Sequence, residues 1–223
     1  LLLPPAWPSM AGKKAAPDFD ALVEQLEALR VACGIERWHL VGYSMGGRIA
    51  LNYVLRYPAN VATLTMVSSS PGVEGEDERE KRRTGDRVWA DRMVQYSPEA
   101  FLESWYNQQV FKSLVRRPEL RRQLIERRRG YAASLLADAL NGWGQGEVPA
   151  AWAELPGLSC PVLSVAGVWD DTYIRHQSRM ARLSPRIRTV MVEQAGHTVH
   201  LEQPLRLAGA IKQFIKESET YEK

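Results

Sequence analysis

Residues 38–48, WHLVGYSMGGR, decide the fold of this chain. Their first four residues predict a short buried strand, and the helical pattern over residues 48–56 ends before a proline. Between the two, residues 42–46 match the pattern G-x-S-x-G, in which a sharp turn from strand to helix lifts a serine above the sheet. Glycines two positions to either side allow the turn without Cβ clashes, and the N-terminus of the next helix favours negative charge near the serine oxygen. We therefore predict that Ser44 carries the chemistry.

Strands and helices alternate on both sides of this stretch. Before it, apolar residues recur with helical spacing over residues 18–33. This predicts a helix with Asp18 as its N-cap and Gly34 just beyond its C-terminal end. After it, runs rich in β-branched residues predict strands at 61–68, 161–166 and 187–192. Further helices are predicted near 172–183 and 205–216. The alternation predicts an α/β fold with a mostly parallel sheet and helices on its faces.

The segment from Pro71 to Pro156 interrupts this alternation. It has helical character throughout and contains no convincing strand. Arginines crowd two parts of it, and acidic neighbours neutralise only some of their charge. We interpret residues 71–156 as a helical lid inserted into a core made of residues 1–70 and 157–223.

A reactive serine needs a base and an acid that orients the base. In sheets of this kind both follow strands, in the order acid and then histidine, which is the order of the α/β-hydrolase fold. One predicted strand leads into Asp170 and Asp171, and the next leads into His197. Because the carboxyl ends of parallel strands share one edge of the sheet, we expect these residues to meet Ser44 there.

Each partner of the serine has a competitor. Asp170 is favoured over Asp171 because it stands three residues after Gly167, where the turn should aim it inward, although either could simply cap the next helix. His197 is favoured because it follows a glycine at a strand exit, and His200 is the second candidate. The predicted triad is Ser44, Asp170 and His197.

Composition and charge argue against several other classes of protein. The chain has 223 residues, 45% hydrophobic and 25% charged, which is ordinary for a soluble domain. No stretch approaches the ~20 apolar residues that cross a bilayer, and the apolar run at the start is too short for a secretory leader. We expect a soluble, cytoplasmic protein. Cys33 and Cys160 match no ligand spacing, so no metal site or cofactor is predicted.

Four segments resemble one family in particular. The chain is similar, from Phe19 onward, to the 2-succinyl-6-hydroxy-2,4-cyclohexadiene-1-carboxylate synthases (MenH) of menaquinone (vitamin K2) biosynthesis. The two segments around the serine and the histidine occur in many hydrolases, whereas the two in the lid are more specific. The segments are VGYSMGGR (41–48), SWYNQ (104–108), LADAL followed by GQG (136–146) and AGHTVHLE (195–202).

The resemblance implies a lyase reaction rather than hydrolysis. The family removes a proton next to the succinyl carbonyl of 2-succinyl-5-enolpyruvyl-6-hydroxy-3-cyclohexene-1-carboxylate and expels pyruvate. By this resemblance Ser44, activated by His197, is the base, Asp170 holds the imidazole, and no acyl-enzyme forms. The backbone N–H of Met45 is expected to be one oxyanion donor.

The resemblance also assigns five residues to substrate binding. The substrate is a small anion with three carboxylates, and arginine offers carboxylates two parallel donors and keeps its charge when partly desolvated. If these residues have no part in substrate binding, a lid arginine would lie on a solvated helix face, and an aromatic residue at 105 would lie in the core of the lid. Arg127 and Arg129 flank one of the arginines, so which of these three faces the pocket stays open. The assigned residues are Tyr43, Arg48, Arg82, Trp105 and Arg128.

The sequence departs from a complete fold of this type before Ser44. Several strands normally precede the elbow, and a loop among them supplies the second oxyanion donor. Only 43 residues precede Ser44, and they hold one predicted helix and a proline-rich leader. We expect that the N-terminal strands are missing, that the strand before Ser44 forms an open edge unless something covers it, and that one oxyanion donor lacks a source.

Other functions stay open on sequence alone. A serine carboxylester hydrolase would use Ser44 as a nucleophile, although a neutral ester would favour an apolar pocket. A catalytically impaired relative would bind a small anion or a partner through the basic lid. Nucleic-acid binding is disfavoured because the net charge is only +3 and acidic residues are interleaved with the arginines. No membrane association is predicted, and the sequence does not distinguish a monomer from a dimer.

Overall fold

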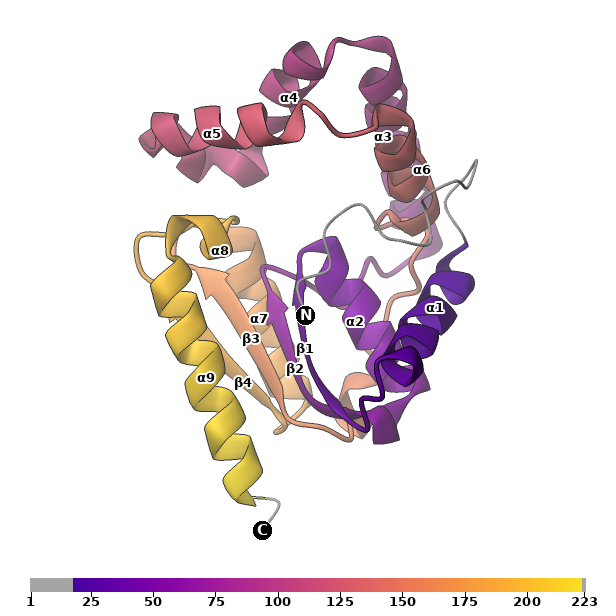
Figure 1. Ribbon diagram of the computed structural model, residues 1–223, viewed down its shortest axis with the longest axis vertical. Coiled ribbons are helices and arrows are strands. Elements are labelled where there is room, and N and C mark those ends of the chain that lie inside the picture. The colour runs from indigo at the N-terminus through magenta and orange to yellow at the C-terminus, as the bar shows by residue number, and fades with distance from the viewer. Residues whose placement is uncertain (1–17, 222–223) are drawn as a thin grey trace.

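Four strands form one sheet in the computed structural model, which describes residues 18–221. All neighbouring strands are parallel and lie in the order β1-β2-β3-β4 (Figure 1). Parallel neighbours require crossover connections, and helices lie in all three of them. The α/β architecture predicted from the sequence is therefore confirmed. The strands are β1 (Trp38–Tyr43), β2 (Val61–Val67), β3 (Val162–Gly167) and β4 (Ile187–Val192).

Helices cover both faces of the sheet. On one face, Leu51, Leu64 and Met180 belong to the largest buried cluster. On the other face, Val67 and Phe214 share a second cluster. The covering helices are α1 (Phe19–Ala32), α2 (Met45–Arg56) and α7 (Asp171–Leu183) on the first face and α9 (Pro204–Tyr221) on the second. Burial on both faces is the usual setting of a parallel sheet and explains why the inner strands are almost wholly apolar.

Local signals set most of the helix boundaries. α1 begins after Asp18, whose carboxylate accepts a backbone hydrogen bond at 2.7 Å, and it ends before Gly34, whose φ is +62°. The sequence pattern predicts the next helix from residue 48, but α2 begins at Met45. The carbonyl of Ser44 already accepts a backbone hydrogen bond at 3.0 Å, so the first turn forms directly after the serine.

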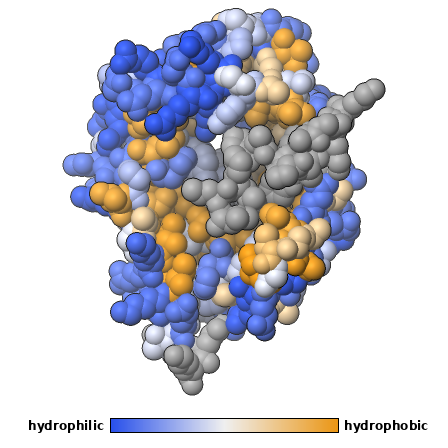
Figure 2. Space-filling view, in the orientation of Figure 1, coloured by the Kyte–Doolittle hydropathy of each residue, from blue (hydrophilic) through white to orange (hydrophobic). Residues whose placement is uncertain are grey.

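The chain between β2 and β3 forms a helical insertion, all of which is described and none of which is strand. It stands over the carboxyl edge of the sheet (Figure 1), and on the face seen in Figure 2 the part formed by α4 and α5 is largely hydrophilic. Trp89, Phe101 and Trp105 contact one another in an apolar cluster of its own. The insertion, residues 76–143, comprises α3 (Glu76–Gln95), α4 (Pro98–Tyr106), the 3-10 helix η3 (Gln109–Arg116), α5 (Pro118–Arg128) and α6 (Ala133–Trp143).

β1 lies at one edge of the sheet, as expected for the strand before Ser44. Within residues 18–221, β2 is the one strand that pairs with it, and the Val41 side chain is 52% exposed. None of the helices in this part of the chain is long and apolar enough to cross a bilayer. The remaining elements are η2 (Pro58–Asn60), η4 (Leu155–Gly157) and α8 (Val199–Glu202).

Candidate active site

Ser44 lies between β1 and α2 in a strained backbone conformation. Its φ of +50° falls in the left-handed region that residues with side chains rarely adopt. Two hydrogen bonds hold the turn: the Ser44 N–H donates to the Val67 carbonyl at 2.9 Å, and the Ser69 hydroxyl donates to the Ser44 carbonyl at 2.7 Å. The sharp turn after the strand is the geometry that the motif predicts.

The glycines of the elbow differ in how much they are needed. A Cβ at Gly42 would lie 2.4 Å from the carbonyl oxygen of Gly46, and a Cβ at Gly47 would lie 2.5 Å from the side chain of Ser69. A Cβ at Gly46 would meet no atom within 4 Å. The expectation that both motif glycines prevent clashes therefore holds for Gly42 and not for Gly46, and Gly47 is the second position where space is limiting.

The structure brings Ser44, His197 and Asp170 together at the carboxyl edge of the sheet. Nε2 of His197 lies 3.2 Å from Oγ of Ser44, and Nδ1 lies 2.9 Å from Oδ2 of Asp170. The histidine is 3% exposed and the aspartate 6%. These contacts have the geometry in which an imidazole draws a proton from a hydroxyl while a carboxylate fixes its tautomer.

The two adjacent aspartates point in different directions. Asp170 caps α7 by accepting the N–H of Tyr173 at 3.4 Å through Oδ1, and its other oxygen faces His197. Asp171 is exposed and pairs with Lys112 of the insertion at 3.4 Å. One carboxylate can therefore cap α7 and orient the imidazole at the same time.

His200 lies close to the triad without facing Ser44. Its ring packs on Tyr43 with the centroids 4.3 Å apart, and its Nδ1 is buried without a hydrogen-bond partner in the described chain. Burial, reinforced by the positive charge of Arg128, lowers the pKa of His200 to about 4. The ring is thus neutral at physiological pH and adds a polar atom to the wall of the site.

Arg48 is a buried cation with unsatisfied donors. It is 3% exposed, and its Nε and Nη1 atoms have no hydrogen-bond partner among the described residues. Burial lowers the pKa of Arg48. The Tyr173 side chain, which interacts with the guanidinium, raises this pKa again, and the positive charge of nearby Arg82 lowers it. Unpaired buried charge is costly, so this arrangement favours an anionic ligand.

Arg82 is engaged by a residue that the sequence analysis did not single out. Its Nε and Nη2 atoms donate to the two carboxylate oxygens of Asp86 at 3.1 and 2.6 Å. The Asp86 side chain is 4% exposed, whereas that of Arg82 is 43% exposed. The spacing of four residues on one helix could have indicated this pair. Arg82 acts electrostatically on Arg48. Its pairing with Asp86 neutralises part of the charge of Arg82.

Arg128 lies at the end of α5, on the side of the site where His200 stands. Its guanidinium is 5.9 Å from the ring centre of Tyr106, whose buried hydroxyl has no hydrogen-bond partner in the described residues. Burial raises the pKa of Tyr106 and Tyr43 and keeps both hydroxyls neutral, and the charge of Arg128 opposes both shifts. Its neighbours differ: Arg127 is exposed, and Arg129 pairs with Glu126 and Glu99.

The aromatic residue at 105 belongs to the core of the insertion. Trp105 packs against Trp89 with centroids 5.2 Å apart and against Phe111 at 6.2 Å. Phe111 in turn packs edge-on against His197 at 5.7 Å. Trp105 thus reaches the triad through Phe111, which the sequence analysis did not identify.

Tyr173 is the central residue that sequence reasoning missed. Its ring lies 4.7 Å from that of His197, its N–H donates to Asp170, and its hydroxyl lies 3.5 Å from Nε2 of Gln145. Because the side chain also interacts with Arg48, it joins the triad to the buried cation. Its position three residues after the predicted acid was the one available signal.

Met45 supplies the first backbone N–H of α2, directly after the serine. Amides in the first turn of a helix have no acceptor within the helix, and they carry the positive end of its dipole. The N-terminus of α2 therefore suits negative charge developing next to Ser44.

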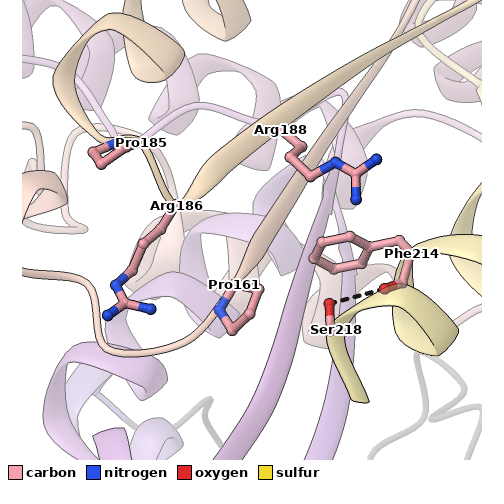
Figure 3. Close-up of a pocket in the computed structure, with 6 residues that line it drawn as sticks. All are labelled: Pro161, Pro185, Arg186, Arg188, Phe214 and Ser218. Carbon is pink, nitrogen blue, oxygen red and sulfur yellow. Dashed lines mark hydrogen bonds between the residues drawn. The ribbon is translucent and has the colours of Figure 1, made fainter. Parts of the chain in front are cut away.

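A separate pocket lies at the opposite edge of the sheet (Figure 3). Pro161 directly precedes β3 and Arg186 directly precedes β4, so the pocket opens at the amino ends of these strands. The Ser218 hydroxyl in it donates to the Phe214 carbonyl at 2.8 Å. Because Ser44 lies at the carboxyl edge, this pocket has no part in the candidate site.

Comparison with known proteins gives a consistent grouping. Residues 6–204 match a family described as the alpha/beta hydrolase fold. A Serratia proteamaculans 2-succinyl-6-hydroxy-2,4-cyclohexadiene-1-carboxylate synthase is 33% identical over 95% of this chain and 84% of its own length. A Bacillus subtilis protein provisionally named as the same synthase is 35% identical over 79% of this chain. The match covers 65% of the Bacillus protein, just under two thirds of its length. The structure of MenH from S. aureus superposes with a TM-score of 0.85 at 28% identity, covering 91% of this chain and 76% of that one.

Proposed function

The chain belongs to the α/β-hydrolase family and, within it, to the family of the 2-succinyl-6-hydroxy-2,4-cyclohexadiene-1-carboxylate synthases, and from this premise we propose that it is a carbon–oxygen lyase. Its substrate would be 2-succinyl-5-enolpyruvyl-6-hydroxy-3-cyclohexene-1-carboxylate, and its products 2-succinyl-6-hydroxy-2,4-cyclohexadiene-1-carboxylate and pyruvate. The reaction would supply menaquinone biosynthesis in the cytoplasm.

The elimination needs a base, a stabilised carbanion and a leaving group. The base removes the proton from ring carbon 2, next to the succinyl carbonyl, and its electron pair forms the double bond between carbons 2 and 3. The former double bond between carbons 3 and 4 moves to carbons 4 and 5, and the bond from carbon 5 to the enolpyruvyl oxygen breaks. The departing enolpyruvate takes up a proton and becomes pyruvate.

The triad geometry suits both proton transfers. With Nε2 of His197 3.2 Å from Oγ of Ser44, the imidazole takes the hydroxyl proton as the serine oxygen removes the proton from the substrate. The imidazolium then protonates the leaving enolpyruvate, and Asp170 stabilises it meanwhile. The N–H of Met45, the first of α2, would stabilise negative charge that develops on the succinyl carbonyl oxygen.

The observation that carries the proposal is the buried guanidinium of Arg48, whose Nε and Nη1 atoms have no hydrogen-bond partner among the described residues. A carboxylate bound there would satisfy Nε and Nη1 and offset the cost of burying the charge. Arg82 adds positive charge on the same side, and Arg128 adds it on the side of Tyr106. Three arginines near the site, of which Arg82 is already paired with Asp86, would suit a substrate with three carboxylates.

Release of pyruvate from the cyclohexene substrate tests the proposal. Formation of pyruvate is followed through NADH oxidation by added lactate dehydrogenase. We expect saturable release that falls by at least about 100-fold in Ser44→Ala, in line with the loss of a general base. Arg48→Ala should raise KM by roughly 10-fold or more, because it removes a charged hydrogen-bond donor pair. Wild-type protein that releases no pyruvate above the buffer rate contradicts the proposal.

The same serine geometry would also serve an ester hydrolase, so hydrolysis of a p-nitrophenyl ester is the matched comparison. A lyase should prefer the tricarboxylate over the neutral ester by several orders of magnitude in kcat/KM, because Arg48 gains a partner only from an anion. Faster turnover of the ester would favour hydrolysis. Binding of the tricarboxylate with no turnover of either compound would favour an impaired binding protein.

A further inference from the structure

The carboxylate of Glu202 is buried beside His197 and has no part in the chemistry described above. It ends α8, and its side chain is 0% exposed. Its Oε1 accepts the backbone N–H of Gly196 at 3.1 Å and that of Thr198 at 3.2 Å. One carboxylate oxygen therefore holds the backbone on both sides of His197.

The same oxygen also contacts the insertion. The Ser113 hydroxyl of η3 donates to Oε1 of Glu202 at 3.1 Å, across 89 positions of sequence, and Ser113 is itself buried. A Cβ at Gly196 would lie 2.3 Å from the Ser113 hydroxyl oxygen. The glycine before His197 is therefore what allows η3 to lie directly on the histidine loop.

Two further side chains of this segment contact the loop. Arg117 donates through Nη2 to the Gln194 carbonyl at 2.8 Å, and its Nε lies 3.8 Å from Oε2 of Glu202. Oε2 has no hydrogen-bond partner in the described chain, so the ion pair with Arg117 adds to the donors on Oε1 in offsetting the charge of the carboxylate. Phe111 packs on the ring of His197. Residues 109–117 thus form the surface by which the insertion docks on the loop.

We propose that Glu202 is a positioning residue that couples the docking of residues 109–117 to the alignment of His197 with Ser44. A buried carboxylate is stable only when donors satisfy it, and here the donors come from the histidine loop and from the insertion together. If the insertion moved away, Glu202 would lose Ser113 and Arg117 at once, and the loop would lose part of what fixes it. The inference rests on the proposed function only in that Ser44 and His197 act as a pair.

Labelling of Ser44 by a fluorophosphonate tests this without the natural substrate. The reagent reacts with a serine that a histidine activates, and mass spectrometry of the full chain gives the rate, with Ser44→Ala as the blank. We expect Glu202→Ala to slow labelling by at least about 10-fold, because a 1 Å displacement of a catalytic group has effects of this order or larger. Glu202→Gln keeps the acceptor oxygen and should stay within about 3-fold of wild type, and Ser113→Ala should fall between the two.

A matched control separates alignment from overall stability. Glu27 is another carboxylate with several donors, namely Arg30, Tyr53 and Asn60, and it lies in α1 away from the triad. Glu27→Ala should lower the Tm and leave labelling unchanged. A folded Glu202→Ala that labels at the wild-type rate overturns the proposal, as does a Glu202→Gln variant no faster than Glu202→Ala.

Two further outcomes are informative. If Glu202→Ala does not fold, Ser113→Ala decides the question, because it leaves the carboxylate in place, and unchanged labelling in that variant overturns the coupling. Wild-type protein that is labelled at Ser44 and yet releases no pyruvate contradicts the proposed function while leaving the role of Glu202 supported by the variants. Wild-type protein that is not labelled at all overturns the inference itself.

Discussion

Several buried polar atoms of residues that neighbour the triad have no hydrogen-bond partner within residues 18–221. In the described chain, Nε and Nη1 of Arg48, the hydroxyl of Tyr106 and Nδ1 of His200 all lack a hydrogen bond. Native proteins leave few such groups, because each costs about 1–3 kcal/mol when unsatisfied. Under the proposed function, a polar, anionic ligand would supply partners for these atoms.

Tyr173 gives a prediction at the scale of the single residue. Tyr173→Phe removes the hydroxyl near Arg48 and Gln145 but keeps the ring on His197. We expect KM for the tricarboxylate to rise about 5-fold with kcat nearly unchanged, since one hydrogen bond contributes about 1 kcal/mol. Steady-state kinetics of pyruvate release measure both constants. Tyr173→Ala is the control and should also lower kcat, because it exposes the imidazole ring; a Phe variant that loses kcat instead would contradict this assignment.

His200 gives a prediction for acid stability. Its folded-state pKa is lowered from 6.5 to about 4, so between these pH values the unfolded chain binds a proton that the folded chain does not. Stability from this residue is therefore present above about pH 6.5 and is lost as the pH falls toward 4, by roughly 2 kcal/mol after allowance for its partial exposure. In His200→Leu, urea unfolding should show a correspondingly smaller loss of stability between pH 7 and pH 4. His176, whose pKa burial also lowers, is present in both proteins and cancels in the comparison.

At the scale of the element, the strand, turn and helix around Ser44 form one strained unit. The positive φ of the serine is maintained by hydrogen bonds from Ser44 to β2 and from Ser69 to Ser44. α2 starts directly after the turn, so the positive end of its dipole adjoins Ser44. The insertion is a second unit with an apolar cluster of its own, and this cluster includes Phe111 of η3, which packs on His197.

The glycines of the elbow provide a matched pair of variants. Gly42→Ala places a Cβ 2.4 Å from the Gly46 carbonyl oxygen, where backbone must shift, so we expect a loss of about 2 kcal/mol or more in stability and of most activity. Gly46→Ala meets open space at an ordinary φ and, being in a helix, should be neutral or slightly stabilising. Thermal unfolding and fluorophosphonate labelling of the two variants measure the difference. Equal effects in both would show that the contact at Gly42 is not limiting.

At the scale of the whole molecule, charge is concentrated where the two parts of the chain meet. The net charge is only +3, yet Arg82 of α3 lies near Arg48 of the core, and Arg128 of α5 lies near Tyr43 and His200. The ion pair between Lys112 of the insertion and Asp171 of the core also joins these two parts of the chain. If the proposed function is right, these arginines should attract a multiply charged anion to the site, although the protein as a whole carries little net charge.

This charge distribution predicts a salt dependence. Raising ionic strength from about 0.05 to 0.5 M should increase KM for the tricarboxylate several-fold and leave kcat little changed, because screening weakens attraction between separated charges. Arg128→Gln should reduce that dependence. A neutral p-nitrophenyl ester, if turned over, provides the control and should show no such trend. If KM rose equally for both substrates, the effect of salt would arise from the protein and not from the charge of the ligand.

The sequence by itself determined the α/β order of elements, the elbow and the two loops that follow β3 and β4. These features depend on neighbours within a few positions: apolar periodicity, the glycines of a turn, and the rule that parallel strands end at one edge. Even the choice of Asp170 and His197 could be argued from their distance to a strand exit.

Only the tertiary structure decided which side chains face one another. It paired Arg82 with Asp86 and placed Tyr173 between His197 and Arg48. The contact of Ser113 with Glu202 joins positions 89 apart, and no local pattern records it. The physical reason is that burial and hydrogen bonding depend on how distant segments pack, whereas periodicity and turn chemistry report only the segment that carries them.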